Sequence, residues 1–82
     1  MLVEDHRNIS CGGDPFNYLK SVMKAVSIQL DQGQDAKILL LKEKFPYTRG
    51  TFEGLARTTG LTLQEVSEKE NEVIVNVRKQ RN

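Results

Sequence analysis

The sequence has little cysteine, little histidine and no long apolar run, and each shortage excludes a class of protein. Its 82 residues contain one cysteine, Cys11, and one histidine, His6. One cysteine cannot close an internal disulfide, and the two side chains together fall short of the four ligands of a structural zinc site. The longest aliphatic run, Ile38 to Leu41, is far shorter than the roughly 20 residues that span a bilayer as a helix. We therefore expect a protein without a metal site, in a reducing compartment that is most simply the cytoplasm, with no membrane association.

The sequence also lacks an excess of charge of one sign. Its 12 basic and 11 acidic side chains leave a net charge of +1, which is too little to attract nucleic acid strongly. The first ten residues carry charges and no apolar run, so we expect no signal peptide. The last six residues, VRKQRN, are basic, but a row of acids precedes them. We expect these acids to form a solvated rim: Glu65, Glu68, Glu70 and Glu72.

A helix is predicted from Pro15 to about Leu30. Asp14 is a good N-cap residue, and proline fits the first helical position because its missing N–H would have no helical partner there. Apolar residues then recur at helical spacing and form one stripe. The stripe consists of Phe16, Leu19, Val22, Met23, Val26 and Leu30.

Three strands and a second helix account for most of the remaining chain. The run from Ala36 to Leu41 is too short for a helix and favours a strand that is buried on both faces or lies at the sheet centre. The segment from Thr51 to Gly60 predicts a short helix that buries Phe52, Leu55 and Ala56. Two alternating runs, 61–69 and 72–79, predict a hairpin with its turn at Asn71 and a bulge near Val66, which falls out of phase.

The short apolar start, Leu2 to Glu4, completes the order strand, helix, strand, helix, strand, strand. The first three elements form a βαβ unit, which places its two strands parallel, and the final hairpin makes the sheet mixed. Both helices carry one apolar stripe, so we place them on the same face of the sheet. The expected fold is a single domain, residues 1–82, with the architecture of an α/β (α+β) two-layer sandwich and four strands.

Cys11 lies in the loop between the first strand and the first helix, where open α/β sheets often bind ligands. The positive end of the helix dipole favours a thiolate there, and Gly12 and Gly13 add no side chains that would shield the sulfur. The carboxylate of Asp14 would act in the opposite sense and raise the pKa of the thiol. A free cysteine is also often a small buried hydrophobic residue. His6 and Arg7 are the cationic side chains that could support a thiolate, but position alone leaves both roles open.

At this loop the sequence resembles the TusA/SirA-like family of small sulfur-carrier proteins. The stretch DHRNISC matches the family's Asp-x-Arg-Gly-Leu-x-Cys spacing at Asp5, Arg7 and Cys11, with Ile9 for the leucine and Asn8 for the glycine. Asparagine is a reasonable exchange for glycine where φ is positive. The resemblance extends over nearly the whole chain through element order and turn residues: Gly33, Pro46 and Gly60.

The resemblance implies a sulfur carrier or sulfurtransferase in which Cys11 accepts sulfur as a persulfide and passes it on. The implied partners are sulfur-donor and sulfur-acceptor proteins, and no metal or organic cofactor is required. The residues implied to support the thiol lie in the same loop and helix start: Asp5, Arg7, Gly12, Gly13, Asp14 and Pro15.

One departure from the family pattern motivates a different function. The family has Cys-Pro-x-Pro, whereas this chain has Cys-Gly-Gly-Asp-Pro, so that Pro15 comes one residue later and the first proline is missing. The alternative is therefore a non-catalytic protein-interaction or regulatory module with the same fold. An RNA-binding domain is a weaker alternative, because the chain lacks a basic patch and its aromatic residues are scattered along the sequence. These are Phe16, Tyr18, Phe45, Tyr47 and Phe52, of which Phe16 and Phe52 are expected in the core.

Overall fold

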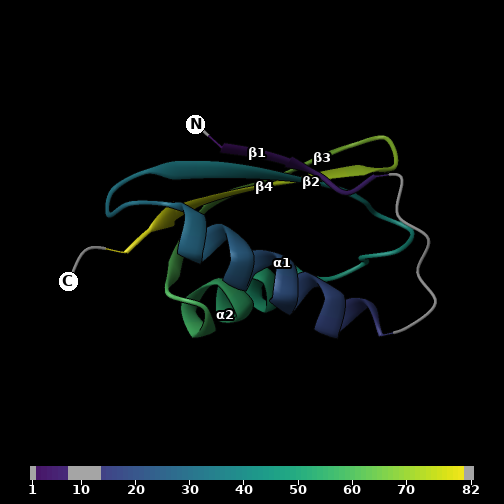
Figure 1. Cartoon of the computed structure of the whole chain (residues 1–82). Coiled ribbons are helices and arrows are strands. Elements are labelled where there is room, and N and C mark those ends of the chain that lie inside the picture. The colour runs from purple at the N-terminus through teal and green to yellow at the C-terminus, as the bar shows by residue number, and fades with distance from the viewer. Residues whose placement is uncertain (1, 8–13, 81–82) are drawn as a thin grey trace.

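The computed structural model describes residues 2–7 and 14–80, which form a four-stranded sheet covered by helices (Figure 1). The elements are β1 (Leu2–Asp5), α1 (Pro15–Gln29), β2 (Asp35–Leu41), α2 (Arg49–Thr58), β3 (Leu61–Lys69) and β4 (Glu72–Lys79). Their order along the chain is the predicted one. Three of the predicted site residues, Cys11, Gly12 and Gly13, lie outside the described residues.

The strands follow the order β1-β2-β4-β3 across the sheet. β1 pairs with β2 in parallel, whereas β4 is antiparallel to both β2 and β3. Figure 1 shows α1 and α2 on the same side of this sheet. The two-layer α+β sandwich with a mixed sheet is therefore confirmed, and the carboxyl ends of β1 and β2 lie at the same edge of the sheet.

The core lies between the sheet and the helices and is built from alternate residues of the central strands. Ile38 pairs in register with Val75, and Leu40 with Val73, and all four side chains are buried. The intervening side chains, such as Leu39, are half-buried, because no described element covers the other face of the sheet. Of the two alternatives for this run, the position at the sheet centre is confirmed, and burial on both faces is not what the strand shows.

Helix α1 begins as predicted. The carboxylate of Asp14 accepts a hydrogen bond from the amide of Phe16, and Pro15 occupies the first helical position. The predicted apolar stripe is buried with one exception, since Phe16 is 43% exposed. Helical spacing gives a side chain's direction around the axis, but not how far the core extends along it. The ring of Phe16 instead packs edge-to-face against Tyr47, with centroids 6.0 Å apart.

Helix α2 begins at Arg49, two residues before the predicted segment, with Thr48 as its N-cap residue. Phe52, Leu55 and Ala56 are buried as expected. Gly60 follows the helix with φ of 85°, a left-handed conformation that a side chain would strain. The glycine therefore ends the helix and turns the chain directly into β3, as the sequence predicts.

The hairpin of β3 and β4 also follows the sequence. The register shifts between Leu63 and Glu65, which confirms the bulge predicted from Val66. The strands are joined through Glu70 and Asn71, and the positive φ of 56° belongs to Glu70. Asn71 instead holds the turn after β2, because its side-chain oxygen accepts from the amide of Glu43. The hairpin tip is thereby fixed against the chain at the carboxyl end of β2.

The opposite end of the sheet carries a polar contact that the sequence pattern did not indicate. The ammonium group of Lys79 on β4 donates to the backbone oxygen of Ser27 at 2.9 Å and to its hydroxyl at 2.8 Å. Ser27 is 5% exposed and lies in the last turn of α1. A cation is favourable at a helix C-terminus, where unpaired carbonyl groups gather. Lys79 therefore ties the end of α1 to the last strand.

Candidate functional site

The candidate site is built where β1 ends and α1 begins. The pairing of β1 with β2 continues one residue beyond the strand, since the amide of His6 donates to the carbonyl of Leu39 at 2.9 Å. Because side chains alternate along a strand, Asp5 and Arg7 then lie on the open face of the sheet and His6 on the helix-covered face. The residues just before the segment 8–13 are therefore held in place by main-chain pairing.

Asp5 and Arg7, which the sequence assigned to the site, are in direct contact. The guanidinium of Arg7 donates from Nε and Nη2 to the two carboxylate oxygens of Asp5, both at 2.9 Å. This hydrogen bonding lowers the pKa of Asp5 to about 2. Nη1 of Arg7 also donates to Glu72 Oε1 at 3.0 Å, so the cluster joins the end of β1 to the start of β4.

The Asp5–Arg7–Glu72 cluster limits what Arg7 can do for a neighbouring thiol. Two carboxylates face one guanidinium, and their hydrogen bonds raise the pKa of Arg7, with that from Asp5 the larger cause. The cluster has more negative than positive charge, so it does not make its surroundings electropositive. Glu72 belongs to the acids predicted to form a solvated rim, and pairing of β4 with β2 brings it to this position.

The first turn of α1 forms the other side of the site. Asp14 accepts the amide of Phe16 at 3.0 Å, and its carbonyl accepts the amide of Tyr18 at 3.0 Å. Pro15 has no N–H. The amide of Asn17 is therefore the one in this turn with no hydrogen-bond partner among the described residues. Among the described residues, the helix end therefore keeps one unpaired donor, and it also carries the negative charge of Asp14.

A hydrogen bond between side chains connects these two parts of the site. His6 Nδ1 and the hydroxyl of Tyr18, one turn into α1, are 2.9 Å apart. On the other side of the imidazole, Nε2 is 3.4 Å from Oε2 of Glu4. The sequence did not point to the contact between His6 and Tyr18, because twelve residues separate them and neither position has a distinctive pattern.

Aromatic residues that are scattered in the sequence gather beside the site. Edge-to-face or tilted contacts connect His6, Tyr18, Phe45, Tyr47 and then both Phe16 and Phe52. The rings are therefore scattered along the sequence but not in the folded protein, and the expectation that they are dispersed is wrong. Phe45 and Phe52 are nevertheless fully buried, so the faces of these two rings are not available for base stacking.

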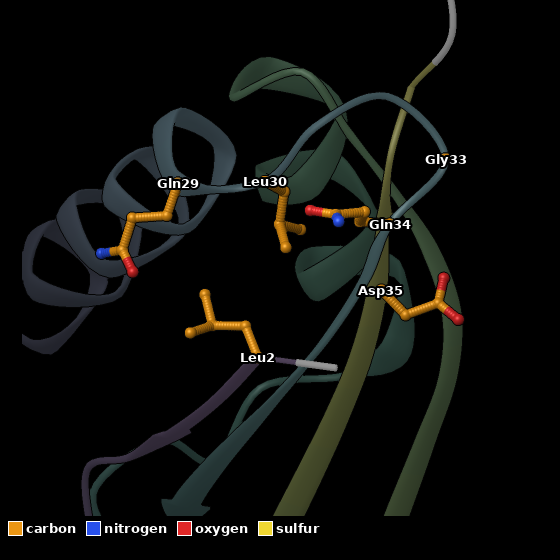
Figure 2. Close-up of a pocket in the computed structure, with 6 residues that line it drawn as sticks. All are labelled: Leu2, Gln29, Leu30, Gly33, Gln34 and Asp35. Atoms are coloured by element: carbon orange, nitrogen blue, oxygen red, sulfur yellow. The ribbon is translucent and has the colours of Figure 1, made fainter.

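A cavity of about 510 Å³ lies at the opposite end of the sheet from the aromatic residues (Figure 2). It lies between Leu2 of β1, the end of α1 at Gln29 and Leu30, and the start of β2. The carboxylate of Asp35 points away from the other labelled side chains in Figure 2. It pairs instead with Arg78, whose hydrogen bond lowers the pKa of Asp35. The carboxylate of Asp35 is therefore not directed into the cavity, and the polar side chains that line it among the described residues are the amides of Gln29 and Gln34.

Within residues 2–7 and 14–80, no group of three or more histidine, cysteine, aspartate or glutamate side chains could hold a metal ion. In the same residues no helix is both long and apolar enough to cross a membrane. No protein-family model matches the chain, and no curated protein matches it. Function is therefore inferred from the residues themselves and from the geometry around them.

Proposed function

We propose that the chain is a small sulfur carrier that accepts and releases sulfur as a persulfide on Cys11. The observation that carries the proposal is the start of α1. Its N-cap residue Asp14 lies three residues after Cys11, and the amide of Asn17 has no hydrogen-bond partner among residues 2–7 and 14–80. A helix N-terminus stabilises an anion through such donors and through its dipole. The chain on the other side of Cys11 is anchored by Arg7, through Asp5 and Glu72.

The proposed transfer needs no oxidant and no cofactor. The thiolate of Cys11 attacks the terminal sulfur of a donor protein's persulfide. A new S–S bond forms on Cys11 as the donor's S–S bond breaks, and the donor leaves as its thiolate. The reverse sequence delivers the sulfur atom to an acceptor, so the carrier returns to its starting state.

Mass spectrometry after incubation with a cysteine desulfurase and free cysteine tests this function. We expect the protein to gain the mass of one sulfur atom, reversibly under reductant, and the Cys11→Ser variant to gain nothing. If the wild-type protein gained no sulfur from several desulfurases, the carrier function would be rejected.

A second candidate function is a non-catalytic interaction or regulatory module. Two observations favour it: Asp14 places a negative charge at the helix start, and Arg7 is already engaged by two carboxylates. The module predicts that Cys11 is alkylated with a midpoint near the ordinary thiol pKa of about 8.5. The carrier predicts a midpoint well below that value. The pH profile of alkylation therefore separates the two functions, and replacing Asp14 by asparagine should lower the midpoint if Cys11 senses its charge.

A further inference from the structure

The helix-covered face of β1 breaks the pattern of the other strands. At the same level of the sheet β2 presents Ile38 and Leu40, which are fully buried, whereas β1 presents Glu4, followed beyond the strand by His6. Glu4 and Ile38 are register partners. Charged side chains at core-facing positions are unfavourable unless they have a function or a partner, so this edge of the sandwich needs an explanation.

A groove of about 220 Å³ lies over these residues, between β1 and α1. It is lined by Glu4, His6, Tyr18, Ser21, Val22 and Ala25. The α1 side is largely apolar, and the polar groups are concentrated at the strand. Sites for drug-sized ligands are usually about 300–1,000 Å³, so this groove suits a single long side chain.

Glu4 differs from the other paired carboxylates of the described residues in its partner. Asp5, Asp35, Glu53, Glu68 and Glu72 each have an arginine or lysine nitrogen within 3.0 Å. Among residues 2–7 and 14–80, the only ion-pair partner of Glu4 is the imidazole of His6, at 3.4 Å, which is a cation only when protonated. Nε2 of His6 is itself buried and makes no hydrogen bond within the described residues. The groove therefore contains a carboxylate, with 28% of its side chain exposed, that has no permanent countercharge in the part of the chain that the structure describes.

The strand beside the groove has an unpaired edge. The amide of His6 points to β2, so the main-chain groups of Val3 and Asp5 point to the other side, where no strand of the described residues lies. The side chain of Val3 is 55% exposed. An extended polypeptide added to this edge would place alternate side chains over the groove.

We propose that this groove binds a lysine or arginine side chain from an extended segment of a partner protein that pairs with the edge of β1. The aliphatic stem lies along Val22 and Ala25, and the ring of Tyr18 offers a face to the cation. The charged end reaches the carboxylate of Glu4, which gains the countercharge that it lacks. Cys11 takes no part, so the proposal is independent of sulfur transfer.

Nuclear magnetic resonance titration of the Cys11→Ser protein with acetyl-Val-Lys-Val-amide tests the proposal. The matched probes are the same peptide with norleucine, which removes only the amino group, and n-butylammonium, which removes the peptide. We expect the lysine peptide to shift the signals of Ala25, Tyr18 and His6. The norleucine peptide should bind about tenfold more weakly, because it lacks a charge-assisted hydrogen bond.

Two variants and a control check that the effect belongs to the groove. Glu4→Gln should weaken the lysine peptide by about the same tenfold, and Ala25→Phe should block binding by filling the groove, whereas Glu65→Gln on β3 should change nothing. Thermal unfolding confirms that each variant is folded.

Equal binding of the norleucine peptide, or of the lysine peptide to Glu4→Gln, would overturn the cation site. Binding of n-butylammonium as tight as that of the peptide would overturn the strand-pairing partner. No binding at all would leave Glu4 as an inward charge that protects an edge strand from pairing, and would overturn the whole proposal.

Discussion

On the helix-covered side of the sheet, the central strands β2 and β4 present aliphatic side chains until β4 ends at Lys79, whereas the edge strand β1 presents Leu2 and Glu4 and leads into His6. The aliphatic side chains of the centre are buried, while Leu2 and Glu4 are half-buried. Both regions use the same alternation of residues along a strand. The difference lies in what covers them, since the groove separates α1 from the middle of β1.

This contrast suggests a division of roles within a small domain, in which the sheet centre supplies stability and the edge strand supplies the polar groups that can bind or react. A chain of this length forms only a small hydrophobic core, and the buried residues of β2, β4 and the helices make up most of that core. The edge is free of that demand, so it can carry charges, a groove and the anchor for the segment that contains Cys11. The following variants test whether the two regions are as different energetically as their burial suggests.

The largest expected effect is at the sheet centre. Leu40 is fully buried on β2, so Leu40→Ala should lower the free energy of unfolding by about 2–5 kcal/mol through lost burial and a residual cavity. Urea denaturation followed by circular dichroism measures it. Leu2→Ala on β1 is the matched control and should cost less than about 1.5 kcal/mol, because that side chain is only partly buried. Equal losses at the two positions would remove the distinction between centre and edge.

A smaller effect is expected where Lys79 meets the end of α1. Lys79→Met keeps the aliphatic stem but removes two hydrogen bonds to Ser27, and should cost about 1–2 kcal/mol. The same denaturation measurement applies. Lys69→Met at the exposed end of β3 is the control and should fall within about 0.5 kcal/mol of the wild type. A neutral Lys79→Met would mean that the contact with α1 contributes nothing net.

Two phenylalanines that contact the same tyrosine sharpen the comparison further. Phe16 and Phe52 lie 6.0 Å and 6.1 Å from Tyr47 between ring centroids, but Phe16 is 43% exposed and Phe52 is fully buried. Phe16→Ala should cost less than about 1.5 kcal/mol, because much of its surface stays in water and one ring contact is lost. Phe52→Ala should cost about 3–5 kcal/mol. Similar values would show that Phe16 is a core residue after all.

The smallest effect is expected at Asp5, and the difference between wild type and the Asp5→Asn variant should shrink further in acid. The hydrogen bonds from Arg7 lower the pKa of Asp5 to about 2 in the folded protein, so the carboxylate stabilises the fold above the ordinary aspartate pKa near 4. That contribution is lost as the pH falls from about 4 to about 2. Asp5→Asn should therefore flatten the stability profile in this window. A variant whose acid profile matches the wild type would contradict the Asp5–Arg7 assignment.

Most of the fold could be predicted because it follows from local patterns. The cap at Asp14 and Pro15, the glycine after α2 and the alternation of β4 each express a rule that acts within a few residues. The predictions failed where they used a local sequence pattern to infer how distant parts of the chain pack together. The ring of Phe16 was expected to be buried, but no described element fully covers the first turn of α1. The aromatic rings were expected to be dispersed, but packing brings them together.

The candidate site could be predicted only in part, for the same reason. Asp5 and Arg7 are two residues apart, and their pairing is within reach of sequence reasoning. Glu72 is 65 residues from Arg7, and Tyr18 is 12 residues from His6. No spacing rule connects such positions, since the register between strands and the placement of a helix over a sheet depend on how the whole core packs.

The amino-acid sequence by itself determined the order of the elements, the boundaries of α1, the bulge in β3 and the presence of one thiol ahead of a capped helix. These depend on backbone propensities and side-chain periodicity, which act over short distances. The tertiary structure alone decided that Arg7 is shared between Asp5 and Glu72 and that the aromatic rings come together. It also decided that Glu4 faces a groove in which the described residues offer no permanent countercharge. Such features arise because packing brings together residues that are far apart in the chain.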